Sequence, residues 1–268
     1  GNGAARADVI IEAIFENAEA KRELYARLEP KMQAGAILGT NTSSIMLETL
    51  ATELADSGRL VGLHFFNPVA RMPLVEVIHG EATRPEVLQA AINFTRQIDK
   101  LPLPCRSAPG FVVNRILIPY MIEATLLAEE GVPLALIDQA ATDFGMPMGP
   151  IELTDVVGLD VAMHVGKILA DAFGKPTSSV VQSLVAQKKL GKKSGEGFYV
   201  WQDGKPVKPP VGNFLPPADL QDRLILPMLN ESVAVLREGV GADGDLLDRA
   251  AVFGTGFAPF RAGPLHYG

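Results

Sequence analysis

Residues Leu60–Ile78 read LVGLHFFNPVARMPLVEVI, in which two apolar runs flank a turn-rich connection. The runs, Leu60–Phe66 and Leu74–Ile78, are predicted to be buried strands. His64 in the first run and Glu76 in the second lie at equal distances from the middle of the connection. If the strands fold back on each other, these two side chains face each other on one side of the sheet. We therefore predict an antiparallel strand pair that brings an imidazole and a carboxylate together.

His64 has two interpretations at this position. A histidine in an apolar strand is often a buried, hydrogen-bonded structural residue. A carboxylate that fixes the tautomer of an imidazole and stabilises its protonated form also makes a general base. Glu76 lies in the apolar run LVEVI, where an unpaired charge is costly, so both interpretations require the His64–Glu76 pair. The strand pattern leaves the choice between them open.

Strands and helices alternate on both sides of this stretch. Further strands are predicted at Asp8–Phe15, Ala36–Thr40 and Leu101–Cys105, and helices at Ala18–Met32, Met46–Ala55 and Arg84–Asp99. Single helices between strands are typical of a doubly wound α/β sheet. We therefore predict that residues 1–107 are the C-terminal part of a doubly wound Rossmann-type domain.

After residue 107 the pattern becomes helical. Helices are predicted at Val112–Glu130, Leu134–Phe144, Gly158–Phe173, Ser178–Lys189 and Ala218–Gly239. The Pro-rich segment Gln202–Pro217 is predicted to be a linker. We therefore expect a first helical domain over residues 108–204 and a second over residues 213–268.

The second helical segment repeats the first. RILIPYMIEATLLAEEGV (Arg115–Val132) aligns without gaps with RLILPMLNESVAVLREGV (Arg223–Val240). Such self-similarity indicates two copies of one helical unit. The copies differ just before the aligned arginine, where the first has Asn114 and the second has Asp222. We therefore expect the second copy to be a packing partner only.

Composition excludes several classes of protein. With 268 residues, 47% of them hydrophobic, the chain is long enough for about two globular domains. A net charge of −7 argues against a nucleic-acid partner, because phosphate contacts need clustered Lys and Arg. No apolar stretch has the length of a transmembrane helix, and the histidines lack the spacing of metal ligands. Cys105 is the only cysteine, which indicates a reducing compartment and a cytoplasmic location.

Polar side chains follow two of the predicted strands. In GTNTSS (Gly39–Ser44), Asn41, Thr42 and Ser43 would project into the crevice at the carboxyl ends of the strands, where ligands of α/β sheets bind. Alternatively, Thr42, Ser43 or Ser44 caps the next helix. Glu16 could cap its helix or accept a hydrogen bond from a ribose, and Lys21 could be a solvated charge or a ligand-binding residue.

The glycine pairs of the chain do not form a phosphate loop. GNGAAR at the start and GEGF at Gly195 precede strands, and GTGFAP at Gly254 follows a helix, so none has the strand–turn–helix setting that binds a pyrophosphate. The chain also starts without methionine, directly before a buried-type strand. We expect it to be a piece of a longer protein and inactive when taken alone.

The motifs together resemble the 3-hydroxyacyl-CoA dehydrogenase family. The resemblance extends over nearly the whole chain, through VIIEAIFENAEAKREL, NTSS, GLHFFNPVARMPLVEVI, PGFVVNRILIPYMIEA, FGMPMGPIELTDVVGLDV and LGKKSGEGFY. With its repeated helical unit the chain is most similar to the dehydrogenase part of the α subunit of the multifunctional fatty-acid oxidation complex. The family's first strand, Gly-rich turn and ribose-binding acid have no counterpart in the sequence.

The resemblance implies NAD-dependent oxidation of (3S)-3-hydroxyacyl-CoA to 3-oxoacyl-CoA in fatty-acid β-oxidation. It implies that His64 takes the proton of the 3-hydroxyl group and that Glu76 orients His64. Ser43 and Asn114 would hold the hydroxyl and the thioester carbonyl. The residues implied to line the nicotinamide half of NAD are Glu16, Lys21, Asn41, Ser43, Asn67 and Lys193.

The resemblance also implies partners. These are an acyl-CoA substrate and a thiolase subunit of a β-oxidation complex. One alternative stays open, namely that the chain is a non-catalytic, acyl-CoA-contacting or assembly fragment of a multifunctional β-oxidation enzyme.

Overall fold

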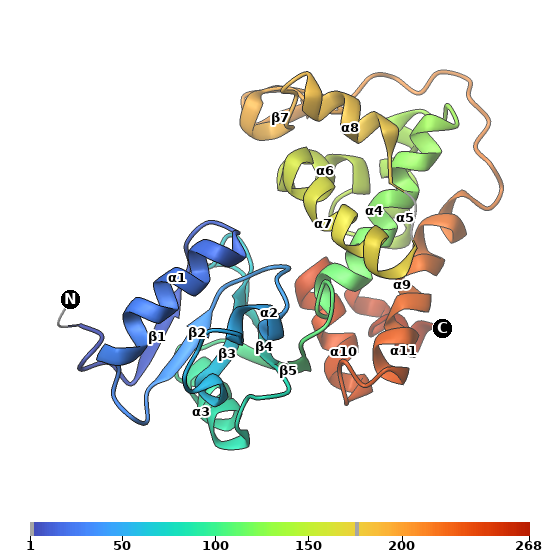
Figure 1. The fold of residues 1–268 in the computed structure, drawn as a ribbon. Coiled ribbons are helices and arrows are strands. Elements are labelled where there is room, and N and C mark those ends of the chain that lie inside the picture. Colours follow the sequence, from blue (N-terminus) through green and yellow to red (C-terminus); the bar gives the residue numbers. More distant parts are fainter. Residues whose placement is uncertain (1–2, 175–176) are drawn as a thin grey trace. The chain divides into compact units, whose positions relative to one another are not determined.

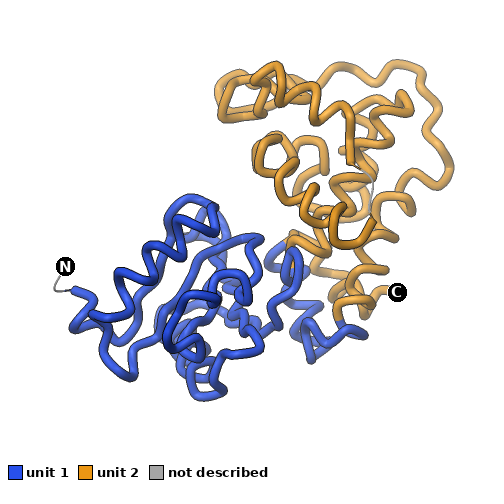
Figure 2. The backbone as a smooth tube through the Cα atoms, viewed as in Figure 1, with its two compact units in different colours: residues 1–112, 236–254 blue, residues 113–235, 255–268 orange. Residues whose placement is uncertain are grey.

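The computed structural model describes residues 3–174 and 177–268, which belong to two compact units (Figure 2). Unit 1 contains the chain up to Val112 together with Leu236–Gly254, and unit 2 contains Val113–Val235 and Thr255–Gly268. Residues of the predicted second helical domain, 213–268, are thus divided between the two units. Within the described ranges, no helix combines the length and the apolar composition that crossing a membrane requires.

Unit 1 is built on a five-stranded sheet whose spatial order follows the sequence (Figure 1). The strands are β1 (Val9–Glu12), β2 (Ile37–Thr40), β3 (Leu60–Phe65), β4 (Leu74–His79) and β5 (Leu101–Arg106). All neighbouring strands are parallel except β3 and β4, which are antiparallel with His64 opposite Glu76. The antiparallel pair and its register are therefore confirmed.

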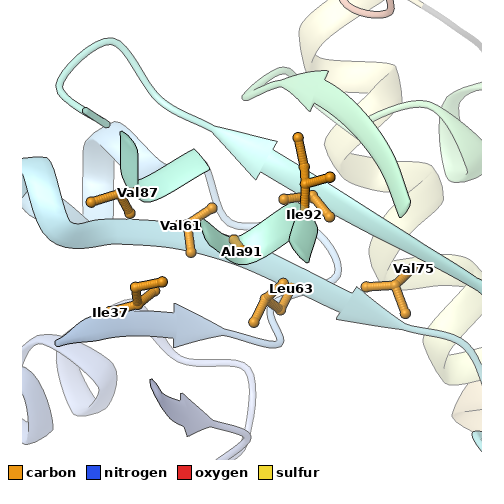
Figure 3. Packing of buried hydrophobic residues seen from close by; sticks show 8 residues of the cluster. Ile37, Val61, Leu63, Val75, Val87, Ala91 and Ile92 are labelled. Carbon is orange, nitrogen blue, oxygen red and sulfur yellow. The ribbon is translucent and has the colours of Figure 1, made fainter. Parts of the chain in front are cut away.

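Helices join the parallel strands of unit 1. They are α1 (Ala18–Leu28), α2 (Leu47–Ala51) and α3 (Pro85–Gln97), and α10 (Gly244–Ala250) also belongs to this unit. Figure 3 shows how α3 lays Val87, Ala91 and Ile92 against Val61 and Leu63 of the central strand. Full burial of such side chains stabilises the fold by about 1.5–3 kcal/mol each. This packing holds β3, and with it His64, in a rigid sheet.

Three predicted elements of unit 1 are shorter in the structure by four residues or more. The predicted helix Ala18–Met32 ends as an α-helix at Leu28 and continues as a 3₁₀ turn, because Pro30 has no amide hydrogen to donate. The predicted strand Asp8–Phe15 ends at Glu12, whose carboxylate accepts a hydrogen bond from the Ile14 amide. The predicted helix Met46–Ala55 is limited to α2.

Unit 2 is mainly helical. Its helices are α4 (Val113–Glu129), α5 (Leu134–Phe144), α6 (Pro150–Val157), α7 (Leu159–Phe173), α8 (Ser179–Ala186), most of α9 (Leu220–Arg237) and α11 (Pro264–Tyr267). Helix α6 was not predicted, because its Gly-flanked sequence looks like a turn. Inside it lies Asp155, which is fully buried and accepts hydrogen bonds from the Phe198 and Tyr199 amides.

A small hairpin interrupts the segment predicted to be a linker, Gln202–Pro217. Strands β6 (Val200–Gln202) and β7 (Lys205–Val207) pair in antiparallel fashion around Asp203 and Gly204. Both turn residues have positive φ values, 51° and 76°, as a tight hairpin turn requires. The Asp-Gly dipeptide is a hairpin signal that the Pro-rich composition obscures.

Helices α4 and α9 contact each other through reciprocal ion pairs. The Arg115 guanidinium lies 3.2 Å from the Glu231 carboxylate, and the Arg223 guanidinium lies 2.7 Å from that of Glu123. In the gapless alignment Arg115 matches Arg223 and Glu123 matches Glu231. Each arginine therefore pairs with the glutamate of the other segment, as in a contact with two-fold symmetry.

Candidate active site

His64 and Glu76 form a buried pair on the central strands of unit 1. The Nδ1 atom of His64 lies 2.7 Å from Oε2 of Glu76, and the two residues are only 6% and 0% exposed. The other carboxylate oxygen of Glu76 accepts a hydrogen bond of 2.9 Å from the Val112 amide. Because Glu76 is held at both oxygens, it fixes the orientation of the imidazole.

Two aromatic rings enclose the imidazole of His64. The ring of Phe66 is 4.6 Å from it and that of Phe111 is 5.9 Å from it, centroid to centroid. Phe111 is fully buried and has a φ of 50°, an uncommon value for an aromatic residue. Backbone strain of this kind persists where the surroundings impose it, and it is frequent at functional sites. Local sequence gives no signal for Phe111 or Val112 beyond the turn-forming Pro-Gly that precedes them.

Asn41 connects the carboxyl ends of three strands. Its amide donates to the Glu12 carbonyl at the end of β1, and its side-chain Oδ1 accepts from the Phe65 amide at the end of β3. Asn41 itself directly follows β2. Asn41 therefore lies at the carboxyl edge of the sheet, next to the strand that carries His64.

The hydroxyls of the NTSS segment do not cap the following helix. Thr42 accepts from the Ile45 amide within the loop, at 2.9 Å. The first residue of α2, Leu47, donates its amide instead to Ser107 Oγ at 3.0 Å. The capping alternative is therefore wrong for this segment.

Glu16 binds the loop that contains Ser43. One of its carboxylate oxygens accepts from Thr42 Oγ1 at 2.6 Å and from the Ser43 and Ser44 amides at 2.9 and 3.1 Å. Burial opposes the charge of Glu16, but these hydrogen bonds and the nearby charge of Lys21 outweigh it and hold its pKa below the ordinary value. Of the two interpretations of Glu16, the one as a helix cap is therefore wrong.

The side chain that caps α1 belongs to the next residue, Asn17, which accepts from the Ala20 amide at 2.9 Å. Because Asn17 caps α1, the Glu16 carboxylate is available to bind the loop that contains Ser43.

Lys21 is buried in an ion pair, so its interpretation as a solvated charge is wrong. Its Nζ lies 2.8 Å from Glu12 and 3.4 Å from Glu16, and its side chain is 1% exposed. Glu12 also accepts from Tyr25 Oη at 2.7 Å and Thr40 Oγ1 at 2.9 Å. The sequence reading missed Glu12, although a carboxylate in the apolar run DVIIEAI is the same signal that singled out Glu76.

The remaining predicted site residues are Asn67, Asn114 and Lys193. Asn67 is exposed in the connection after β3. Asn114 is half-buried at the start of α4, and Lys193 forms an ion pair with Asp160; both belong to unit 2. The residues that the structure brings together in unit 1 through shared or neighbouring contacts are His64, Glu76, Asn41, Ser43, Glu16 and Lys21.

Comparison with known families covers most of the chain. Residues 2–108 match the model described as "3-hydroxyacyl-CoA dehydrogenase, NAD binding domain". Residues 110–201 match "3-hydroxyacyl-CoA dehydrogenase, C-terminal domain". A Rossmann-like NAD-binding domain with a largely parallel sheet is therefore followed by a helical C-terminal domain.

Individual relatives agree with these matches. The fatty acid oxidation complex subunit alpha of Vibrio cholerae is 39% identical over 99% of this chain, and that of Psychrobacter cryohalolentis is 37% identical over 98%. The chain spans 39% and 40% of the lengths of these two proteins.

Solved structures give a similar result. The 3-hydroxybutyryl-CoA dehydrogenase of Escherichia coli matches with a TM-score of 0.87 and 31% identity, covering 100% of this chain and 75% of that one. The (S)-3-hydroxybutyryl-CoA dehydrogenase of Ralstonia eutropha matches with a TM-score of 0.72 and 34% identity, covering 75% of this chain and 73% of that one. The chain belongs to the 3-hydroxyacyl-CoA dehydrogenase family.

Proposed function

We propose that the protein oxidises (3S)-3-hydroxyacyl-CoA to 3-oxoacyl-CoA with NAD, and that His64 is the general base. The observation that carries this proposal is the buried His64–Glu76 pair on the central strands of an NAD-binding domain. Removal of hydride from a secondary alcohol requires that its hydroxyl proton also leave. A positioned imidazole accepts such a proton effectively near neutral pH.

The hydrogen bond to Glu76 supports different roles for the two ring nitrogens of His64. An ionised carboxylate only accepts hydrogen bonds, so Nδ1 of His64 carries the hydrogen and donates it. Its Nε2 then has the lone pair that receives the hydroxyl proton of the substrate. Glu76 stabilises the imidazolium that results, and it is positioned for this by the Val112 amide.

The polar residues at the carboxyl edge suit a nicotinamide cofactor. Asn41 and Glu16 provide an amide and a carboxylate, which match the donor and acceptor groups of a carboxamide. Lys21 is buried against Glu16 and supports that carboxylate. We propose that these residues, with Asn67 and Lys193, hold the nicotinamide half of NAD, which accepts the hydride when bound.

Ser43 and Asn114 complete the proposed substrate contacts. Ser43 would hold the 3-hydroxyl group, and its loop is held in turn by Glu16. Asn114 would hold the thioester carbonyl, a group that the hydride transfer does not alter.

The repeated sequence and the sheet order also bear on the architecture of the two units. We infer that the sheet of unit 1 is part of a doubly wound arrangement and that α9 begins a second copy of the unit that begins with α4. The reciprocal pairs Arg115–Glu231 and Arg223–Glu123 support this inference, because a repeated unit that contacts its own copy produces such exchanges.

Partners follow from the chemistry of the product. A 3-oxoacyl-CoA is the substrate of thiolytic cleavage, and the curated relatives are named as subunits of a fatty acid oxidation complex. We propose a thiolase subunit as partner, and a cytoplasmic location stays a prediction.

A spectroscopic assay tests the proposed reaction. The full-length protein that contains this chain is purified and given NAD and either the (3S) or the (3R) epimer of a 3-hydroxyacyl-CoA, and NADH absorbance is followed. We expect NADH to form with the (3S) epimer and not with the (3R) epimer. Absence of turnover with both epimers, in protein shown by circular dichroism to be folded, would refute the proposal.

A further inference from the structure

Unit 2 contains a large cavity between helices α4, α6, α7 and the start of α8. Its volume is about 740 Å³, within the roughly 300–1,000 Å³ that small-molecule sites occupy. All of the residues that line it belong to unit 2, and none of them has a role in the proposed chemistry. The cavity is therefore a candidate binding site that the catalytic proposal does not explain.

The wall of this cavity is chiefly apolar. Helix α4 contributes Ile118, Met121 and Ile122, and the facing side chains come from Met163 on α7 and Val181 on α8. Charged residues of α7, such as Lys167 and Asp171, also line it but are strongly exposed and pair with each other at 2.9 Å. An apolar interior with a polar rim is the usual form of a site for a largely apolar ligand.

The buried hydroxyl groups in the wall already donate to protein acceptors. Thr125 Oγ1 donates to the Ile122 carbonyl and Thr154 Oγ1 to the Pro150 carbonyl, each at 2.7 Å. Ser178 Oγ donates to the Glu129 carboxylate at 2.9 Å. Since these hydrogens are already engaged, the interior favours hydrocarbon over a polar ligand.

Helix α7 leaves room for a chain along one side of the cavity. Ala162, Gly166 and Ala170 follow each other at one-turn spacing and all line the cavity. Gly166 is buried, yet a Cβ atom added to it would meet no atom within 4 Å. Close-packed interiors rarely leave such space beside a buried helix, so we take the space to be functional.

We propose that this cavity binds the hydrocarbon chain of a fatty-acyl group. The identification of the ligand rests on the proposed function, because a 3-hydroxyacyl-CoA carries an unbranched alkyl chain beyond its reacting carbons. An alkyl chain needs no hydrogen bonds, so it suits an apolar space that is lined by small residues on one side.

Direct binding tests this proposal without any turnover. The fluorescent fatty acid cis-parinaric acid is titrated into the protein and then displaced by butyrate, octanoate, laurate or palmitate. Each methylene that enters the cavity should tighten binding by up to about fourfold, until the cavity is filled and the gain levels off.

Two variants place bulk in the cavity and a third controls for it. Gly166→Leu and Ala170→Leu extend side chains into the cavity, and they should weaken palmitate binding by at least about tenfold. In both variants, the increase in affinity with each added methylene should stop at a shorter fatty acid than in the wild type. Ala172→Leu is the matched control, because Ala172 lies on the same helix but is exposed and does not line the cavity. It should bind palmitate like the wild type.

Each result separates the alternatives. Failure of cis-parinaric acid to bind, or equal palmitate affinity in wild type, Gly166→Leu and Ala170→Leu, overturns the proposal. If those two variants instead convert a dimer to a monomer in sedimentation, the cavity is an interface between copies and the proposal is wrong. Turnover of 3-hydroxybutyryl-CoA without fatty-acid binding refutes only the cavity site, whereas binding without any turnover refutes only the proposed reaction.

Discussion

His64 and Glu76 are register partners across the antiparallel pair β3–β4, and their side chains meet at 2.7 Å inside the sheet. The second oxygen of Glu76 is held by the Val112 amide. The imidazole is thus oriented by a carboxylate that cannot turn away without breaking a second hydrogen bond. This arrangement predicts that the two residues act as one unit.

The pair should lose activity non-additively. Glu76→Gln removes the charge that stabilises the imidazolium, and His64→Gln removes the base, so each single variant should lower kcat. Once the base is absent, its partner has nothing to orient, and the double variant should lose much less than the product of the two single losses. The measurement is a kcat double-mutant cycle, and multiplicative losses would show that His64 and Glu76 act independently.

Glu16 should contribute stability that depends on pH. Its pKa in the folded protein lies below its ordinary value of 4.5, so the ionised form stabilises the fold above that pH. The stability that the Glu16 carboxylate contributes begins to fall when the pH drops below 4.5. It is lost once the pH has also passed the lowered pKa of Glu16 in the folded protein. The difference in unfolding free energy between wild type and Glu16→Gln should therefore shrink as the pH falls from neutral to about 3.

Urea denaturation at each pH measures this difference. Glu23→Gln is the control, because Glu23 is an exposed carboxylate on the same helix, α1. A difference for Glu16→Gln that is constant across the pH range would refute the role assigned to its charge.

Replacing only one partner of the Glu12–Lys21 ion pair should strongly lower the free energy of unfolding. Both residues are almost completely buried, and Glu12→Gln would leave the buried Lys21 ammonium with the more distant Glu16 carboxylate, at 3.4 Å, as its counter-charge. Loss of one partner of such a pair typically costs about 3–5 kcal/mol. The double variant Glu12→Gln/Lys21→Met should recover part of this cost in urea unfolding. If the double variant is as unstable as the sum of the single ones, the two charges are not coupled.

The two reciprocal ion pairs of unit 2 should differ in strength. The side chains of Arg115 and Glu231 are 3% and 9% exposed, whereas that of Arg223 is 29% exposed. Arg115→Met should therefore cost about 3–5 kcal/mol of unfolding free energy, and Arg223→Met no more than about 1 kcal/mol. Chemical denaturation of both variants checks this order, and equal costs would contradict it.

Much of unit 1 could be predicted from the sequence because local patterns carry the information. The alternation of apolar runs with helical periodicity identified all five strands, and the symmetric positions of His64 and Glu76 identified the antiparallel step. These features depend on spacing within a short segment. Helix boundaries were less accurate where one residue decides them, as Pro30 does for α1.

Other features depend on contacts between distant segments and could not be predicted. A lysine on an amphipathic helix is usually solvated, and Lys21 is buried only because Glu12 on the preceding strand receives it. The contact of Val112 with Glu76 forms because the chain returns past β4 after β5. No local pattern encodes that return, and the ring of Phe111 reaches His64 by the same path.

The kcat of His64→Gln tests the general-base role most directly. Glutamine keeps a polar side chain of similar length but cannot accept and release a proton, so the fold should survive while the base is lost. The assay follows NADH absorbance in the full-length protein with a (3S)-3-hydroxyacyl-CoA, at saturating substrate and under conditions where chemistry limits the rate. We predict a fall in kcat of about 10²–10⁴-fold, with an unchanged circular dichroism spectrum. A kcat within about threefold of wild type would show that His64 is only a structural residue.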